Sequence, residues 1–154
     1  MPADAPTIVA TSGGLRRGSR SAYALAPLIT HAIELAGIEG RPRICWMGTA
    51  GGDQRFQQAL FAEACEAAGV TMGFLHVYPM PNVDNVLAHL LAHDVVWVGG
   101  GSVANLLALW RLHGLDEIFL RVWHEGVVLA GVSAGSICWH AGGTTDSFGP
   151  TLRA

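Results

Sequence analysis

The sequence contains few charged residues and carries no large excess of either sign. Asp, Glu, Lys and Arg make up only 14% of the 154 residues, and the formal net charge is -3. The absence of a basic run argues against nucleic acid or an anionic membrane as a partner. Because 51% of the residues are hydrophobic, much of the secondary structure must be buried on more than one side. The length suits a single domain, residues 1–154, with a sizeable core.

Long apolar runs and a cysteine framework are also absent. No apolar segment reaches the roughly 18 residues that a membrane-spanning helix requires. The polar, acidic start of the chain, residues 1–6, does not resemble a secretion signal. Cys45, Cys65 and Cys138 are odd in number, widely spaced and embedded in apolar patterns. We therefore expect reduced core cysteines in a cytoplasmic protein, with no disulfide, no metal site and no cofactor.

Apolar strands alternate with amphipathic helical segments along the chain. This alternation is typical of a parallel sheet with helices on both faces, which makes a three-layer α/β fold. Strands are predicted near residues 8–12, 43–47, 72–77, 95–98 and 127–132. Helices are predicted over residues 21–36, 54–68, 83–92, 102–113 and 115–125.

The most informative segment is an apolar run, residues 127–132, that leads into a Gly-x-Ser-x-Gly motif centred on Ser133. The apolar residues predict a strand enclosed on both faces. The small residues that follow allow a sharp turn into a helix that begins near Ser136. This strand–turn–helix context is what a nucleophile elbow requires, because the turn lifts the serine hydroxyl clear of the sheet. We therefore predict that Ser133 is a catalytic nucleophile.

Glycine-rich or small-residue turns follow four of the five predicted strands. In a parallel sheet these turns share one edge, where ligands bind. Glycine is common in such turns for structural reasons alone, but Gly99–Gly101 is harder to explain in that way. It follows an apolar strand and precedes a helix that Ser102 is expected to cap, so its amides add to the positive end of that helix.

Two motifs resemble a known family. Residues 98–102, followed by Asn105, and residues 130–136 about thirty positions later resemble the peptidase E (aspartyl dipeptidase) and cyanophycinase family. Residues 138–139 and 144–149 also match its bacterial peptidase E-like members. The resemblance implies a flavodoxin-like sheet related to the class I glutamine amidotransferases. Those enzymes carry cysteine at the elbow, so the serine of this chain indicates the peptidase branch.

The resemblance also implies roles for individual residues. Ser133 matches the family's nucleophile, and the amides of Gly100, Gly101 and Ala134 match its oxyanion hole. Asp146 matches a loop position near the site, although an acid that makes hydrogen bonds within its own turn is the favoured interpretation. The implied activity is hydrolysis of short peptides, including dipeptides with an N-terminal aspartyl residue.

The family's general-base histidine, its acidic partner and its substrate-selecting basic residue lie downstream of the elbow. Only 21 of the 154 residues follow Ser133, too few for those elements. A serine hydroxyl without a base is a poor nucleophile at neutral pH. We therefore expect a C-terminally truncated form of a longer peptidase. A site completed by another component and an inactive chain remain the alternatives.

No histidine within the chain is an evident substitute for this base. His140 lies seven residues past Ser133, roughly 10 Å along a helix and out of hydrogen-bond reach. His89 and His93 share a helix face but lack the glutamate of a zinc-protease motif, so a solvated or capping pair is predicted. His76 ends a predicted strand, where a histidine satisfied within the core is the usual case.

Two other classes of function match parts of the sequence. Residues 99–104 fit a loose Gly-x-Gly-x-x-Ala dinucleotide fingerprint, but they follow the fourth strand, and no strand-terminal acid lies about twenty residues further on. A catalytically inactive, flavodoxin-like binding domain is the main alternative to a peptidase, because the base is missing. The sequence predicts neither the exact substrate nor the oligomeric state.

Overall fold

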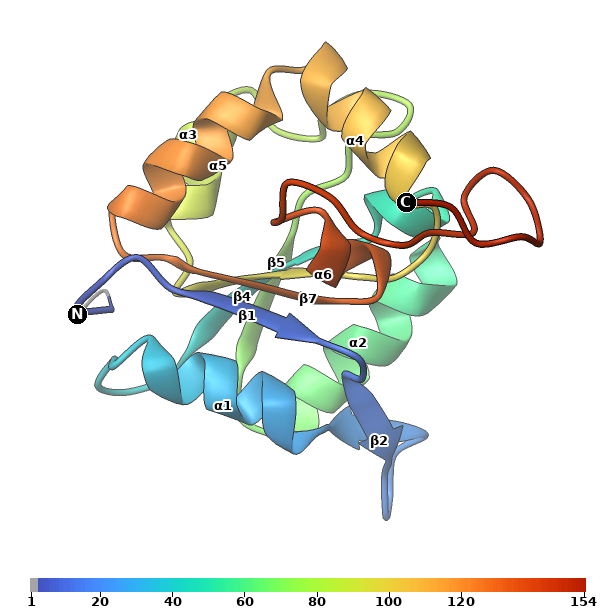
Figure 1. Ribbon diagram of the computed structural model, residues 1–154. Coiled ribbons are helices and arrows are strands. Elements are labelled where there is room, and N and C mark those ends of the chain that lie inside the picture. Colours follow the sequence, from blue (N-terminus) through green and yellow to red (C-terminus); the bar gives the residue numbers. More distant parts are fainter. Residues whose placement is uncertain (1–2) are drawn as a thin grey trace.

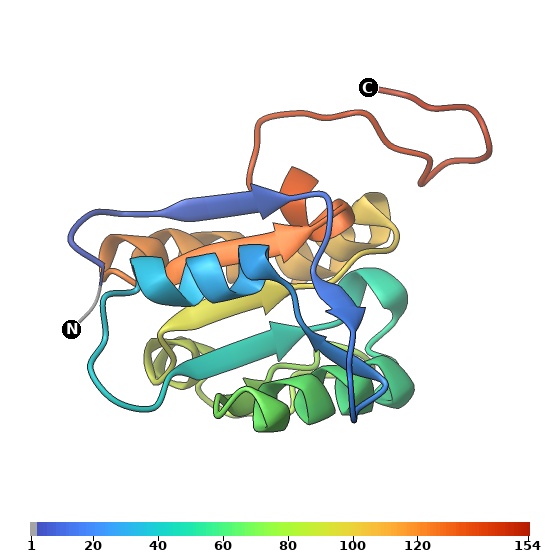
Figure 2. The same cartoon turned by 90° about the horizontal axis from the view of Figure 1, so that it is seen from below.

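A five-stranded parallel sheet forms the centre of the computed structural model, which describes residues 3–154. In space the strands follow the order β1-β7-β6-β4-β5, and their carboxyl ends all point to the same edge (Figure 2). This confirms the predicted α/β fold. The strands are β1 (Ile8–Thr11), β4 (Arg43–Met47), β5 (Thr71–Phe74), β6 (Val95–Val98) and β7 (Val128–Val132).

The order of β4 to β7 is that of the first four strands of a flavodoxin-like sheet. The strand β1 lies beside β7, in the position that the last strand takes in flavodoxin itself. The chain adds β5 on one side of β4 and then β6 and β7 on the other side, so the direction in which strands are added reverses between β4 and β6. In open α/β sheets such a reversal leaves a crevice at the carboxyl edge, and this crevice is the usual place for a ligand.

Helices cover both faces of the sheet and complete the three layers (Figure 1). Helices α1 and α2 pack on one face, and α3, α4 and α5 pack on the other. The bounds are α1 (Pro27–Leu35), η1 (Thr49–Gly51), α2 (Arg55–Ala67), α3 (Val86–Leu91), α4 (Val103–Leu112), α5 (Leu115–His124) and α6 (Ala134–Ile137). None of the helices between residues 3 and 154 is long and apolar enough to cross a membrane.

The strand β6 shows why the central strands are apolar throughout. All four of its residues are buried. Val95 and Trp97 belong to the core under α1 and α2, whereas Val96 and Val98 belong to the core under α4 and α5. Because successive side chains of a strand point to opposite faces, a sheet covered on both sides requires an apolar residue at every position.

The predicted helix over residues 21–36 is wrong in its first half. A hairpin takes its place, with β2 (Leu15–Arg17) antiparallel to β3 (Tyr23–Leu25), and α1 begins only at Pro27. The proline explains the boundary, since it disfavours helical geometry at the residue before it and is itself favoured in the first helical turn. The guanidinium of Arg16 also donates to the carbonyl of Leu25, 3.2 Å away, which ties the hairpin together.

The third strand is shorter than predicted. It ends at Phe74, and although the amide of Leu75 still donates to the carbonyl of Trp46, the amides of Val77 and Tyr78 bond to a side chain instead. The carboxylate of Asp53 accepts the amides of Val77 and Tyr78 at 2.7 and 2.8 Å. Asp53 is itself 6% exposed and adopts a left-handed backbone conformation, φ 52°. A single acid after a glycine pair forms no sequence pattern, so this link was not predicted.

Replacing Asp53 with alanine is expected to lower the free energy of unfolding by roughly 2–4 kcal/mol, because one buried and one partly buried amide lose a charged acceptor. Urea unfolding followed by circular dichroism measures this loss. The exposed Asp84 provides the matched control, and Asp84→Ala is expected to change stability little. Equal losses in the two variants would contradict the structural role assigned to Asp53.

Candidate functional site

Ser133 occupies a strained turn between β7 and α6. Its backbone angles are φ 55° and ψ −116°, a combination that glycine normally adopts. Among residues 3–154, Asp53 is the only other non-glycine residue with a positive φ. Ser133 is also exposed, although it follows a buried strand. An exposed hydroxyl on a strained strand-to-helix turn is the geometry of a nucleophile elbow.

The two glycines of the motif are required by close packing around this turn. A Cβ on Gly131 would overlap the carbonyl oxygen of Gly135, and a Cβ on Gly135 would overlap the carbonyl oxygen of Val98. The turn is thus pressed against the end of β6. Neighbouring backbone, rather than the preference of the serine itself, holds Ser133 in its strained conformation.

The glycine loop after β6 lies directly beside Ser133. A Cβ placed on Gly100 would lie 3.3 Å from the Cβ of Ser133 and 3.8 Å from its Oγ. Gly101 has φ 143°, and a Cβ there would overlap the backbone of Ala50. The two predicted motifs therefore meet in space, because β6 and β7 are adjacent strands that end at the same edge.

The amides of the glycine loop differ in their hydrogen bonding. Gly99 donates to the carbonyl of Met47 at 2.9 Å, and Ser102 donates to that of Ala50 at 2.8 Å. Within the described part of the chain, no acceptor is found for the amides of Gly100 and Gly101. These two N–H groups therefore have no hydrogen-bond partner among residues 3–154.

The other two residues implied by the resemblance differ in position. Ala134 is buried at the start of α6, where helix amides have no intrahelical acceptor. Asp146 is exposed in the loop after α6, and its backbone carbonyl accepts the amide of Gly149 at 3.0 Å. No hydrogen bond in residues 3–154 joins Asp146 to Ser133. The structure thus gives Asp146 a place in a turn.

Three histidines make hydrogen bonds away from Ser133. His76 is 3% exposed and bonds through Nε2 to Gln58 at 2.7 Å, so the prediction of a satisfied core histidine is confirmed. Burial lowers the pKa of His76. His89 bonds to the carbonyl of Phe74, and the ring of His93 bonds to the carbonyl of His89. None of the three is placed as a general base for the serine.

A pocket of about 650 Å³ lies at the carboxyl edge of β4, where the strand order reverses. The turn over residues 49–52 and the start of α4, including Asn105, form its walls together with Tyr78. The hydroxyl of Thr49 is buried there without a hydrogen-bond partner in the described residues. Because Gly101 packs on Ala50 of the same turn, the pocket adjoins the glycine loop.

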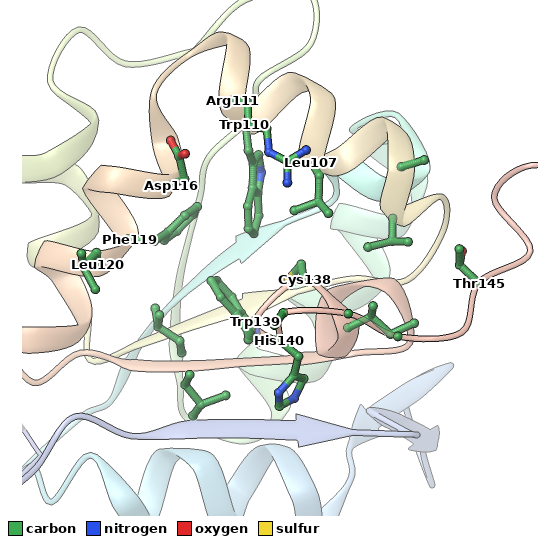
Figure 3. A pocket seen from close by; sticks show the side chains of 18 of the residues that line it. Leu107, Trp110, Arg111, Asp116, Phe119, Leu120, Cys138, Trp139, His140 and Thr145 are labelled. Atoms are coloured by element: carbon green, nitrogen blue, oxygen red, sulfur yellow. The ribbon is translucent and has the colours of Figure 1, made fainter. Parts of the chain in front are cut away.

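A second pocket, of about 780 Å³, is apolar and lies between α4, α5 and the chain after α6 (Figure 3). Its aromatic wall contains Trp110, Phe119 and Trp139, and both other rings lie 5.3 Å from that of Trp139. His140 lines this pocket as well, whereas Ser133 does not. The pocket is therefore separate from the serine turn.

The parallel sheet, the serine elbow and the adjoining glycine loop define an α/β protein of the class I glutamine amidotransferase-like type. Residues 8–153 match the family model described as "Peptidase family S51". The chain therefore belongs to peptidase family S51, the family of peptidase E and cyanophycinase.

Individual relatives agree with this assignment. The "Uncharacterized peptidase YgaJ" of Bacillus subtilis (strain 168) is 42% identical over 110 residues, which cover 71% of this chain and 47% of that protein. A crystal structure of a "Putative Peptidase E Protein" from Listeria monocytogenes EGD-e has the same fold, with a TM-score of 0.55 and 21% identity. That match covers 72% of this chain and 54% of the other. The chain thus spans about half the length of both relatives.

Proposed function

We propose that Ser133 is the nucleophile of a serine peptidase that hydrolyses short peptides, including dipeptides with an N-terminal aspartyl residue. One observation carries the proposal: an exposed serine with φ 55° lies beside Gly100, in a loop whose amides at 100 and 101 have no acceptor in residues 3–154. Membership of family S51 supports peptide hydrolysis. The preference for aspartyl dipeptides rests on the resemblance to peptidase E alone.

In this mechanism the Ser133 oxygen attacks the scissile carbonyl, and a base takes the hydroxyl proton. The carbonyl oxygen becomes an anion, which accepts hydrogen bonds from the amides of Gly100, Gly101 and Ala134. The leaving amine takes up the proton, and water then hydrolyses the acyl-serine ester. The strained turn assists because it holds the hydroxyl away from other acceptors. The pocket at residues 49–52 adjoins this site and offers a place for one end of the peptide.

The general base is the one component that residues 3–154 do not present beside Ser133. His76, His89 and His93 are engaged elsewhere, and His140 is exposed, with its ring directed away from the aromatic residues of the second pocket (Figure 3). We infer that the base comes from outside these residues, as the resemblance to peptidase E implies. The same observation favours the second candidate function, a catalytically inactive domain that binds peptides or other anions at the glycine loop.

Replacing Gly100 with alanine tests the proposed oxyanion site. The added methyl group lies 3.3 Å from the Ser133 Cβ and crowds the space where the substrate oxygen would sit. We expect kcat/KM for short peptides to fall roughly a hundredfold, with little change in Tm. The assay uses a panel of Asp-Xaa and Ala-Xaa dipeptides and the protein as it is produced in the cell.

The outcomes of this panel separate the two functions. Faster turnover of Asp-Xaa than of Ala-Xaa dipeptides supports the aspartyl preference, and equal rates contradict it. Binding of peptides without turnover of any of them supports the inactive domain. An unchanged kcat/KM in Gly100→Ala would remove the glycine loop from the site.

A further inference from the structure

Three metal-ligating side chains meet on the α3 side of the sheet, away from the serine turn. Cys45 comes from β4, His89 from α3, and His93 from the turn after α3. Each offers a ligand atom, and these atoms all lie within 4.8 Å of one another. The Cys45 Sγ is 3.8 Å from the His89 Nε2, and the two imidazole rings are 5.0 Å apart. Both histidines are half-buried beside a buried cysteine, so of the predicted solvated or capping pair the structure shows the capping arrangement.

The sheet leaves room for this cluster at a glycine. Gly73 of β5 pairs with Cys45 of β4, so both positions face α3. A Cβ on Gly73 would overlap the Nε2 of His93. Any larger residue at position 73 would push the His93 imidazole away from Cys45, whereas glycine lets this ring pack directly against the backbone of β5. The cluster therefore depends on three elements that are distant in sequence.

The hydrogen bonds of His93 prepare it as a ligand. Its Nδ1 lies 2.8 Å from the carbonyl of His89, a bond that also caps the end of α3 as predicted. Donation from Nδ1 leaves the lone pair of Nε2 free, and a backbone carbonyl on the second nitrogen is the usual arrangement for a histidine that binds a metal.

We propose that Cys45, His89 and His93 bind one divalent cation of the zinc class, with a water molecule as the fourth ligand. One thiolate and two imidazoles suit Zn²⁺ or Co²⁺ better than Mg²⁺ or Ca²⁺, which prefer oxygen. Tetrahedral coordination brings the donor atoms closer by roughly 1 Å, and His89 gives up its bond to the carbonyl of Phe74.

Binding also releases a proton. The cation binds the thiolate form of Cys45, so the proton of the thiol passes to solvent. Cys45 aligns with Leu129 across the sheet, whereas Ser133 lies four residues further along and two strands over. The cation would thus lie at least about 15 Å from the serine. It therefore ties α3 and the turn after it to β4 and acts on stability rather than on peptide cleavage.

Zinc titration of the metal-free chain against a chromophoric chelator tests this proposal. We expect about one equivalent to bind, a rise in Tm with Zn²⁺, and a thiolate-to-metal charge-transfer band with Co²⁺. His93→Gln should weaken binding at least about tenfold, because it removes a nitrogen ligand and keeps a polar side chain. His31→Gln, at an exposed helix position, is the matched control and should bind normally.

The cysteine ligand has its own matched pair. Cys45→Ser should abolish the Co²⁺ charge-transfer band, whereas Cys65→Ser, at another buried free thiol, should retain it. If Cys45→Ser fails to fold, His93→Gln still decides the question. The proposal is overturned if the wild-type chain binds no zinc, if the band is missing, or if His93→Gln and His31→Gln bind zinc equally well.

Discussion

Ser133→Ala is expected to abolish hydrolysis of short peptides by the protein as it is produced in the cell. The loss in kcat should reach roughly six orders of magnitude if the serine and its base act as a unit. The reason is that alanine removes the attacking oxygen and leaves no group to form the acyl intermediate. Initial rates on the dipeptide panel measure this loss. The unmodified enzyme is assayed at much lower concentrations than the variant, so that both rates can be measured. Ser136→Ala, three residues along the same turn and helix, is a suitable control.

The 154-residue chain by itself is expected to turn over peptides near the background rate. His76, His89 and His93 are all bonded elsewhere, and no hydrogen bond among residues 3–154 joins a histidine to Ser133. Robust turnover by this chain that Ser133→Ala abolishes would show that a base does exist among these residues. Unchanged turnover in Ser133→Ala would remove the serine peptidase mechanism altogether.

Gly135→Ala is expected to lower the free energy of unfolding by about 3 kcal/mol or more and to abolish activity with it. The added Cβ would overlap the carbonyl of Val98 and approach that of Gly99 to 2.9 Å. These atoms are backbone atoms of β6 and its loop, so no side chain can rotate to relieve the overlap. The turn must therefore open, and Ser133 loses its position beside Gly100.

Urea unfolding of Gly135→Ala and of a matched variant measures this effect. Gly142→Ala is the control, because a Cβ on Gly142 meets no atom within 4 Å. We expect this second variant to unfold like the wild type. Equal stability of the two variants would contradict the close packing of the turn against β6.

The local motifs were predictable because each depends on neighbours in the sequence. An apolar run that ends in small residues predicts a buried strand followed by a sharp turn, and Ser133 lies in such a turn. The hairpin over residues 15–25 was missed although Pro27 marks the true start of α1. Residues 21–25 have an apparent helical periodicity, but β3 pairs with β2 instead. Periodicity within one segment does not show whether that segment pairs with another strand.

The end of β5 and the histidine cluster illustrate a different limit. Asp53 accepts hydrogen bonds from the amides of Val77 and Tyr78, which lie more than twenty positions later in the sequence and do not join the sheet. Cys45 and His93 are 48 positions apart and meet only because β4 pairs with β5 and Gly73 leaves space. Such contacts are set by packing between elements, and no local spacing in the sequence records them.

By itself, the sequence determined the alternation of strands and helices, the parallel sheet and the two glycine-rich motifs, because these follow from local hydrophobic patterns and from the small residues in turns. Only the tertiary structure decided that the Gly100 loop lies beside Ser133, that Ser133 is held at φ 55°, and that Cys45 meets two histidines. The physical reason is the strand order. Hydrogen bonding between β6 and β7 aligns their ends, and neighbouring backbone then enforces a conformation that serine alone would not adopt.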